Sequence, residues 1–484
     1  MATGIWISLA AYFLLMLGIG VYAWRKSTSN SEEYMLGGRN LPPSVAALSA
    51  GASDMSGWLL LGLPGALFVS GLSQSWIGIG LFIGAWVNWV VVAPRLRQQT
   101  EEYDNSLTIP GFLGNRFPSQ ARLLRIVSAI VIVVFFAVYT ASGLVGGGKL
   151  FVSAFNGGYM SGVLLTLGIV MVYTVMGGFL AVSLTDFVQG IIMMLALVIM
   201  PIVILTTGQG DGIATAADRL REAVGPDYLS LTAGLTFMGW LSAVAWGLGY
   251  FGQPHIIVRF MAIRSVKEVP TARNIGMSWM AVSLIGAISL GIFGRAYAER
   301  NGLEVADPET IFIILSNLLF HPLVTGFLYA ALLAAIMSTV SSQLLVASSS
   351  LTEDIYHTVF KRDATDRELV TVGRIAVLLV GLVAVVIASN PDAQVLGLVS
   401  NAWAGFGAAF GPLIILALTW KRMTGAGAVA GLIVGAVVVG VWIMLGLSST
   451  LYEIVPGFIA AWIAIVVVSN MTPDTGEYRA PKTV

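Results

Sequence analysis

Long apolar stretches fill this chain and leave few folds open to it. A membrane-spanning helix needs about 20 predominantly apolar residues in a row. Thirteen stretches of this kind lie at 5–24, 43–69, 73–94, 122–151, 160–178, 182–206, 233–258, 274–297, 322–352, 368–388, 394–419, 425–446 and 451–470. Of the 484 residues, 57% are hydrophobic and 10% are charged, whereas soluble domains carry about 25% charged residues. These features predict an all-α polytopic membrane protein with thirteen transmembrane helices.

The basic residues predict an orientation, because lysine and arginine are enriched in cytoplasmic loops. With the N-terminus outside, 20 of the 25 basic residues fall in cytoplasmic segments, a set that includes Arg259. An even number of spans would put both termini on one side and remove this asymmetry. We therefore expect a multi-pass protein of the cell inner (plasma) membrane, with its N-terminus outside and its C-terminus cytoplasmic. The outer polar segments 207–232 and 299–310 are interpreted as caps or gates.

Composition and residue spacing argue against several classes of function. The net charge of zero gives no basic field for nucleic acid. The absence of cysteine excludes a thiolate metal site and a cysteine nucleophile. The three histidines lack metal-ligand spacing, and no paired acid–base constellation indicates an enzyme. The stretch 143–150 is similar to a phosphate-binding loop, but it lacks the Ser or Thr after its lysine.

We expect neither an organic cofactor nor an obligate protein partner. Since the sequence also shows no nucleotide-binding domain, the energy for any transport would come from an ion gradient or from the gradient of the solute itself.

A carboxylate in the second span is the most informative polar residue. Asp54 lies within the apolar run 45–69, among serines and among glycines that weaken a helix. A charge in hydrocarbon costs about 2.5–3.5 kcal/mol on insertion scales, and it persists where it faces a polar interior. An unwound helix also exposes backbone carbonyls that can bind a cation. This pattern predicts the ion site of a secondary transporter.

A second polar stretch, 334–343, lies in the ninth span. On a helix, Ser338, Ser341 and Ser342 share one face, and their hydroxyl oxygens could replace water around an alkali cation, together with the Ala335 carbonyl. Alternatively, these hydroxyls bond back to the preceding turn or pack at helix contacts. For Asp186 the sequence also leaves two interpretations open, a helix cap or an acidic ligand on an ion path.

Aromatic and helix-breaking residues occur together in the seventh span. Between Trp240 and His255, glycines and a proline weaken the helix. Trp246 and Tyr250 could form the walls of a small-solute pocket, with Gln253 as a polar handle. An interfacial aromatic belt is the alternative, although these residues lie inside the apolar span.

The second and seventh spans each begin a block of five helices, at 43–206 and 233–419. Because five is odd, the two blocks enter the membrane from opposite sides. Inverted repeats with a discontinuous first helix point to a binding site near the bilayer midplane. The helix at 5–24 and the pair within 425–470 would be peripheral, and 471–484 would be a short, mobile cytoplasmic tail.

Six motifs are spread over nearly the whole chain: LGGR at 36–39, SAGASDMSGW at 49–58, GGFLAVS at 177–183, WGLGYFGQPH at 246–255, MST at 337–339 and FGAAFGP at 406–412. In these motifs the chain resembles the sodium/solute symporter family, most closely its bacterial proline-transporting members. The resemblance implies the leucine-transporter fold, with a 5+5 inverted repeat and broken helices 2 and 7. It also implies sodium-coupled uptake of L-proline, with another small amino acid or a carboxylate solute as the alternative.

The resemblance further implies the site residues. Sodium would bind the carbonyls or hydroxyls of Ala52, Met55, Ala335, Ser338 and Thr339. Asp54 matches a carboxylate required for sodium-dependent transport, Asp186 an acidic residue on the inner sodium path, and Arg39 a cytoplasmic residue linked to transport. The solute pocket would contain Ser56, Gly57, Trp58, Tyr139, Trp246, Tyr250 and Pro254, beside the polar handle Gln253.

Three positions depart from the resembled pattern. Gln74 stands where a glutamate is expected, Asn401 where a tyrosine is expected and Ser342 where a cysteine is expected. Asn401 could alter the solute pocket or the outer gate. A set similar to the second sodium site of sialic-acid symporters in the same family consists of Asp186, Ser338, Ser341 and Ser342. Two sodium ions per solute is therefore a hypothesis.

Overall fold

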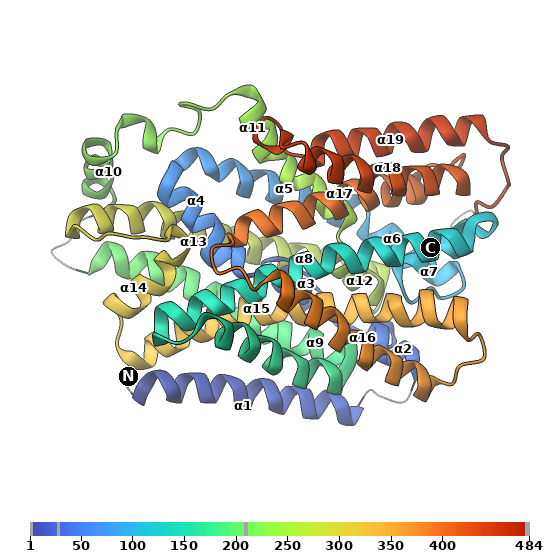
Figure 1. Ribbon diagram of the computed structural model, residues 1–484, viewed down its shortest axis with the longest axis horizontal. Helices are drawn as coiled ribbons and strands as arrows, with labels where there is room; N and C mark the ends of the chain where they lie inside the picture. The colour runs from blue at the N-terminus through green and yellow to red at the C-terminus, as the bar shows by residue number, and fades with distance from the viewer. Residues whose placement is uncertain (1–2, 27–29, 208–211, 480–484) are drawn as a thin grey trace.

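The computed structural model describes residues 3–26, 30–207 and 212–479, and within these ranges its regular secondary structure is helical (Figure 1). The first half of the chain forms α1 (Thr3–Lys26), α2 (Ser31–Leu36), α3 (Pro43–Asp54), α4 (Leu63–Ser70), α5 (Ser75–Val91), α6 (Ala93–Glu102), α7 (Ile109–Arg116), α8 (Ala121–Phe155), α9 (Tyr159–Thr206) and α10 (Ile213–Ala223). The second half forms α11 (Phe237–Val244), α12 (Pro254–Ala262), α13 (Val269–Asn301), α14 (Ile311–Leu319), α15 (Pro322–Ser349), α16 (Asp366–Ile387), α17 (Val395–Thr419), α18 (Gly425–Met444) and α19 (Ile454–Met471).

Local chemistry explains where many of these helices begin. Threonine side chains accept hydrogen bonds from the first-turn amides of α11, α16 and α18, and this satisfies donors that have no partner inside the helix. Proline occupies the first turn of α3, α12 and α15, where its missing N–H costs nothing. Capping threonines and first-turn prolines therefore determine where these apolar helices begin.

Both spans predicted to be discontinuous are broken. In the first, α3 and the following segment Trp58–Ser70 are bent by 60°, and the π-helical turn η2 (Trp58–Gly62) leads into α4. In the second, the 3₁₀ segment η6 (Ala245–Gly252) separates α11 from α12. Each break coincides with the glycine- and proline-containing motif that predicted it, because these residues disfavour a continuous α-helix.

The number of membrane spans agrees with the prediction only in part. Ten helices in the described chain are long and apolar enough to cross a membrane, and the bent pair Pro43–Asp54 and Trp58–Ser70 makes eleven. The predicted spans 160–178 and 233–258 do not reach this length as single straight helices, since Tyr159–Val172 is short and the second is divided by η6. Thirteen spans and the orientation of the termini remain predictions.

The expected loop between spans 160–178 and 182–206 does not form. Instead, α9 continues across Gly178, which adopts φ 57° and ψ −151°. A Cβ atom at this position would lie 2.8 Å from the carbonyl oxygen of Tyr34 in α2. Glycine therefore permits both the positive φ and the close approach of α2, and two helices join at a kink without a loop.

The helices run roughly along the long axis of the molecule (Figure 1). At one edge α1 packs against α9 and α15, and at the opposite edge α18 and α19 pack on each other and on α17. Between these edges α3 contacts α9, α12, α13 and α15. The broken helix thus lies in the interior, where its polar groups are shielded from lipid.

Residues 477–479 at the end of the described chain contact other segments, whereas 480–484 of the predicted tail lie outside the described residues, so its mobility stays a prediction. The Ser119 amide donates to the Glu477 carboxylate at 2.7 Å, and the Arg479 amide donates to the Tyr103 hydroxyl at 2.7 Å. The Tyr478 ring lies 4.9 Å from the Arg116 guanidinium. These contacts hold residues 477–479 against the segments around α6 and α7.

Candidate functional site

The break after α3 frees a backbone carbonyl in the protein interior. Met55 leaves the helix with φ −79° and ψ 76°. As a result, the Ser56 amide donates to the Asp54 carbonyl at 2.9 Å, and not to the Ala52 carbonyl, its partner in a regular helix. The Ala52 oxygen is therefore available to groups from another helix.

Two hydroxyl groups of α15 lie within hydrogen-bonding distance of the Ala52 carbonyl oxygen. Ser338 Oγ lies 2.7 Å from the Ala52 carbonyl oxygen and 3.2 Å from that of Ala335. Thr339 Oγ1 lies 3.4 Å and 3.3 Å from the same two oxygens. Four of the five predicted sodium ligands thus form one buried cluster of hard oxygen atoms between α3 and α15. Met55, the fifth, lies next to it at the break.

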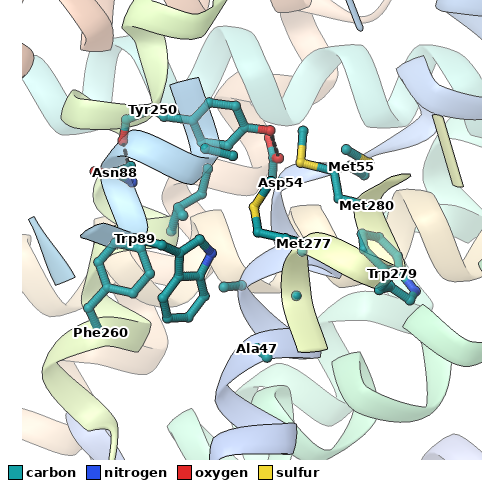
Figure 2. Close-up of a pocket in the computed structure, with 15 residues that line it drawn as sticks. Ala47, Asp54, Met55, Asn88, Trp89, Tyr250, Phe260, Met277, Trp279 and Met280 are labelled. Atoms are coloured by element: carbon teal, nitrogen blue, oxygen red, sulfur yellow. Dashed lines mark hydrogen bonds between the residues drawn. The ribbon is translucent and has the colours of Figure 1, made fainter. Parts of the chain in front are cut away.

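The Asp54 side chain faces the other broken helix. Its Oδ2 accepts a hydrogen bond from the Tyr250 hydroxyl of η6, as Figure 2 shows. Its Oδ1 is buried and has no hydrogen-bond partner among the residues that the structure describes. The Asp54 carbonyl accepts from Tyr139 Oη and from Trp58 Nε1, each at 3.3 Å. Asp54 therefore links the predicted ion site to the predicted solute pocket.

A small cavity lies beside this carboxylate. It has a volume of about 20 Å³, which is room for about one water molecule. Its wall includes Asn88, Met277 and Met280, which the sequence interpretation missed, together with Asp54 and Tyr250 (Figure 2). An amino acid does not fit this volume, so any solute bound here requires its walls to move.

The other residues predicted to bind the solute lie near two different helices, α15 and α17. Ser56 Oγ lies 3.4 Å from the Trp58 amide, and Gly57 packs against Ile336 of α15. The Trp246 carbonyl and the Gln253 side chain contact Trp403 of α17, and Pro254 begins α12. The Trp246 ring lies 5.3 Å from the ring of Tyr452.

Trp403 of α17 is a central residue that the sequence interpretation missed. Its Nε1 donates to the Trp246 carbonyl at 2.7 Å, its carbonyl accepts from Gln253 Nε2 at 3.1 Å, and its ring lies edge-on to Tyr250 at 5.0 Å. A Cβ atom on Gly249 would lie only 1.8 Å from this indole. The glycines of the seventh span thus allow close aromatic packing in addition to weakening the helix.

Asp186 belongs to a separate buried cluster. It lies in the middle of α9, so the interpretation as a helix cap is wrong. Its Oδ2 accepts from Ser49 Oγ at 2.8 Å, and Ser342 Oγ and Arg259 Nη2 lie 3.3 Å and 3.2 Å away. The basic-residue pattern predicts Arg259 in a cytoplasmic segment, but its side chain is fully buried in α12.

The set expected for a second sodium ion is only partly assembled. Ser342 reaches Asp186, whereas Ser341 Oγ donates to the Ser338 carbonyl at 3.1 Å. Ser338 itself turns to Ala52. Ser342 Oγ also donates to the Ser338 carbonyl, at 2.7 Å, so for both serines the interpretation as a hydroxyl bonded back to its own helix describes the contact.

A larger cavity of about 430 Å³ lies beside Trp246 and Glu309. Glu309 belongs to the polar segment interpreted as a cap or gate, and its carboxylate lies 2.8 Å from Lys149 Nζ. The same carboxylate accepts from the amides of Val395 and Leu396, at 2.9 Å and 3.0 Å. It thereby connects α8 to the N-terminus of α17, where a negative charge is favoured.

Arg39 is held by contacts that the sequence interpretation did not supply. Its guanidinium donates to Asn105, Thr100 and the carbonyls of Ser106 and Met261 at 2.7–3.0 Å. It thus connects the loop before α3 to the end of α12.

Known proteins similar to this chain are transporters. The high-affinity proline transporter PutP of Bacillus subtilis (strain 168) is 58% identical over 459 residues, which cover 94% of this chain and 96% of that protein. The osmoregulated proline transporter OpuE of the same organism is 53% identical over 99% of this chain and 97% of that protein. The sodium/proline symporter of Staphylococcus aureus (strain JH9) is 52% identical over 98% of this chain and 94% of that protein.

Two solved structures share the leucine-transporter-like fold with this chain. One is the substrate-bound outward-open state of a Na⁺-coupled sialic acid symporter, described as revealing a novel Na⁺-site. Its TM-score is 0.82 at 20% identity, over 98% of this chain and 99% of that one. The other is Mhp1, a nucleobase-cation-symport-1 family transporter, in a closed conformation. Its TM-score is 0.57 at 13% identity, over 93% of this chain and 97% of that one.

A sequence model of the sodium:solute symporter family matches residues 34–435, most of the chain. The resemblance drawn from the six motifs is thereby confirmed. Together with its apolar helices, the match leads to one conclusion: this multi-pass membrane protein belongs to the sodium:solute symporter family.

Proposed function

We propose that this protein takes up L-proline by alternating access, driven by the inward flow of sodium. The observation that carries the proposal is the buried group of carbonyl and hydroxyl oxygens between α3 and α15. The names of the three relatives, all proline transporters, support the choice of solute. Inward movement of one positive charge is favoured by about 2.3 kcal/mol per 100 mV, which supplies energy for accumulation.

In this proposal sodium binds the oxygens of Ala52, Met55, Ala335, Ser338 and Thr339. The carbonyl freed at the break of α3 and the two hydroxyls of α15 are ligands of the type that hard cations prefer. Bound sodium would stabilise the contact between α3 and α15 and would thereby favour one orientation of the broken helix. Asp54 lies two residues from Ala52 and transmits this change toward Tyr250.

The solute would bind on the other side of the same break. Its carboxylate would meet polar groups at the break around Ser56 and Gly57, and its ring would pack on aromatic side chains. The residues assigned to this pocket are Ser56, Gly57, Trp58, Tyr139, Trp246, Tyr250, Gln253 and Pro254. Of these residues only Tyr250 lines the cavity of about 20 Å³ beside Asp54, so the solute pocket would form in a conformation different from this one.

The proposal includes thirteen spans, an outer N-terminus and a cytoplasmic C-terminus. Two five-helix repeats would run through 43–206 and 233–419. The two broken helices, each at the start of one repeat, support this arrangement. In Figure 1, α1 begins near one end of the long axis and α19 ends near the other, as an odd number of crossings requires.

A sodium symporter for another small amino acid or a carboxylate solute is the second candidate. The same ion site would serve such a protein, because none of the proposed sodium ligands defines the solute. Competition of unlabelled amino acids and short carboxylates against labelled proline separates the two candidates.

The decisive experiment is uptake of labelled proline into proteoliposomes under an inward sodium gradient, with a potassium gradient as control. Asp54→Asn keeps the shape of the side chain and removes its charge. The matched variant is Asp392→Asn, which changes an exposed carboxylate outside the site. We expect saturable, sodium-dependent uptake in the wild type and in Asp392→Asn, and its collapse in Asp54→Asn. Uptake that does not depend on sodium would contradict the sodium site. Failure of proline to enter or to compete would contradict its assignment as the solute.

A further inference from the structure

Arg259 supplies the positive charge in the buried cluster around Asp186. Asp186, Arg259, Ser49 and Ser342 are all fully buried and come from α9, α12, α3 and α15. The Arg259 guanidinium lies 3.2 Å from the Asp186 carboxylate, 2.6 Å from Ser342 Oγ and 3.1 Å from Ser49 Oγ. Its remaining nitrogen donates to the His255 carbonyl.

These contacts use two of the oxygens that a second sodium ion would need, Asp186 Oδ2 and Ser342 Oγ. Asp186 Oδ1 is buried and has no hydrogen-bond partner among the residues that the structure describes. A buried carboxylate requires a positive partner, and here the partner is a fixed guanidinium with hydrogen bonds to both serines. A sodium ion bound to the same oxygens would lie roughly 4 Å from that guanidinium. At an effective dielectric constant of about 20, the repulsion at this distance corresponds to a roughly thousandfold loss of affinity.

The cluster is also connected to the proposed sodium site. Ser342 Oγ donates to the Ser338 carbonyl at 2.7 Å, and Ser338 Oγ is a proposed sodium ligand. Arg259 lies in α12, directly after the second break, so its position depends on the conformation of the second broken helix. The guanidinium is therefore placed to take part in coupling without being transported.

We propose that Arg259 is a tethered cation that occupies the place of a second sodium ion. It neutralises Asp186 and limits the transporter to one sodium per solute. This inference rests on the proposed sodium coupling and is an alternative to the hypothesis of two sodium ions. It makes Arg259 a positioning and stoichiometry-determining residue, since it touches neither the solute pocket nor the proposed ligands of the first sodium ion.

The test compares sodium stoichiometry in the wild type and four variants. Arg259→Gln removes the charge but keeps hydrogen-bonding groups, and Arg259→Lys keeps the charge. The double variant Asp186→Asn/Arg259→Gln removes both buried charges. Arg264→Gln is the control, because Arg264 follows α12 closely but is exposed to solvent. Each is reconstituted, and the ratio of labelled sodium to labelled proline flux is measured with the Hill coefficient for sodium.

We expect a flux ratio near one for the wild type, Arg259→Lys and Arg264→Gln. Arg259→Gln should shift the ratio toward two and raise the Hill coefficient above one, because sodium replaces the lost charge. The double variant should return to one. A purely structural role for Arg259 would reduce the rate without changing the ratio, and an unchanged ratio in Arg259→Gln overturns the proposal.

Equilibrium binding of labelled sodium to purified protein gives a second readout that needs no transport. One bound ion in the wild type supports the proposal, and two overturn it even if Arg259→Gln does not fold. The proposed function fails separately, when the wild type shows no sodium-driven uptake of proline. A wild-type flux ratio of two would leave sodium coupling intact and reject only the role of Arg259.

Discussion

Removal of one hydroxyl tests the proposed sodium site. Ser338 Oγ lies 2.7 Å from one proposed ligand oxygen and 3.2 Å from another, so Ser338→Ala deletes a ligand at the centre of the cluster. Polar contacts to a charged group contribute about 1.5–3 kcal/mol, and 1.4 kcal/mol corresponds to a factor of ten. We therefore expect the sodium concentration for half-maximal proline uptake to rise about 10- to 100-fold. The maximal rate at saturating sodium should change little.

The assay is initial proline uptake into proteoliposomes across a series of sodium concentrations at constant ionic strength. Ser348→Ala is the matched control, since Ser348 is also a buried serine of α15 but donates to the Leu345 carbonyl at 2.9 Å. Its sodium dependence should stay close to that of the wild type. An unchanged sodium requirement in Ser338→Ala, or an equal rise in both variants, would refute the assignment of this hydroxyl as a ligand.

Three further substitutions test other parts of the structure. Tyr250→Phe removes the phenol that donates to the buried carboxylate of α3; the loss of about 1.5–3 kcal/mol should lower proline uptake about tenfold or more, and normal uptake would contradict this role. Gly178→Ala places a Cβ atom 2.8 Å from a carbonyl oxygen at a residue with φ 57°. Thermal unfolding should show a loss of stability of at least about 1–2 kcal/mol. The control Gly168→Ala in the same helix meets nothing within 4 Å and should be tolerated. Glu309→Ala breaks a buried ion pair and two amide contacts. Because the chain has no cysteine, a Ser400→Cys probe in the larger cavity can be labelled selectively with maleimide. If the contacts of Glu309 contribute about 1.4 kcal/mol or more to closure, their loss should make the probe react about tenfold faster.

Much of the architecture follows from short-range sequence properties. Apolar stretches of about 20 residues predict membrane helices because each backbone polar group must be satisfied within its own segment. Glycine and proline disfavour an α-helix wherever they occur, so the breaks near Met55 and Gly249 could be placed correctly. The residues of the proposed sodium cluster, in contrast, came from family resemblance, since a serine-rich helix face alone leaves back-bonding as an equal interpretation.

Other features depend on contacts between segments far apart in the chain. Nothing next to Arg259 in the sequence indicates that it meets Asp186, 73 residues away, so a count of basic residues assigned it to a loop. Trp403 contacts Trp246 and Gln253 across about 150 residues. Gly178 joins two helices because α2 packs against it, which a local pattern cannot reveal.

The sequence by itself therefore determined that the chain forms apolar helices, which two of them are discontinuous and which side chains are polar within them. Tertiary structure alone decided which of those polar groups meet. The physical reason is that helix formation and breaking depend on neighbouring residues, whereas a buried charge needs a partner from any helix that packs against it. The pairing of Asp54 with Tyr250 and of Asp186 with Arg259 is consequently a property of helix packing.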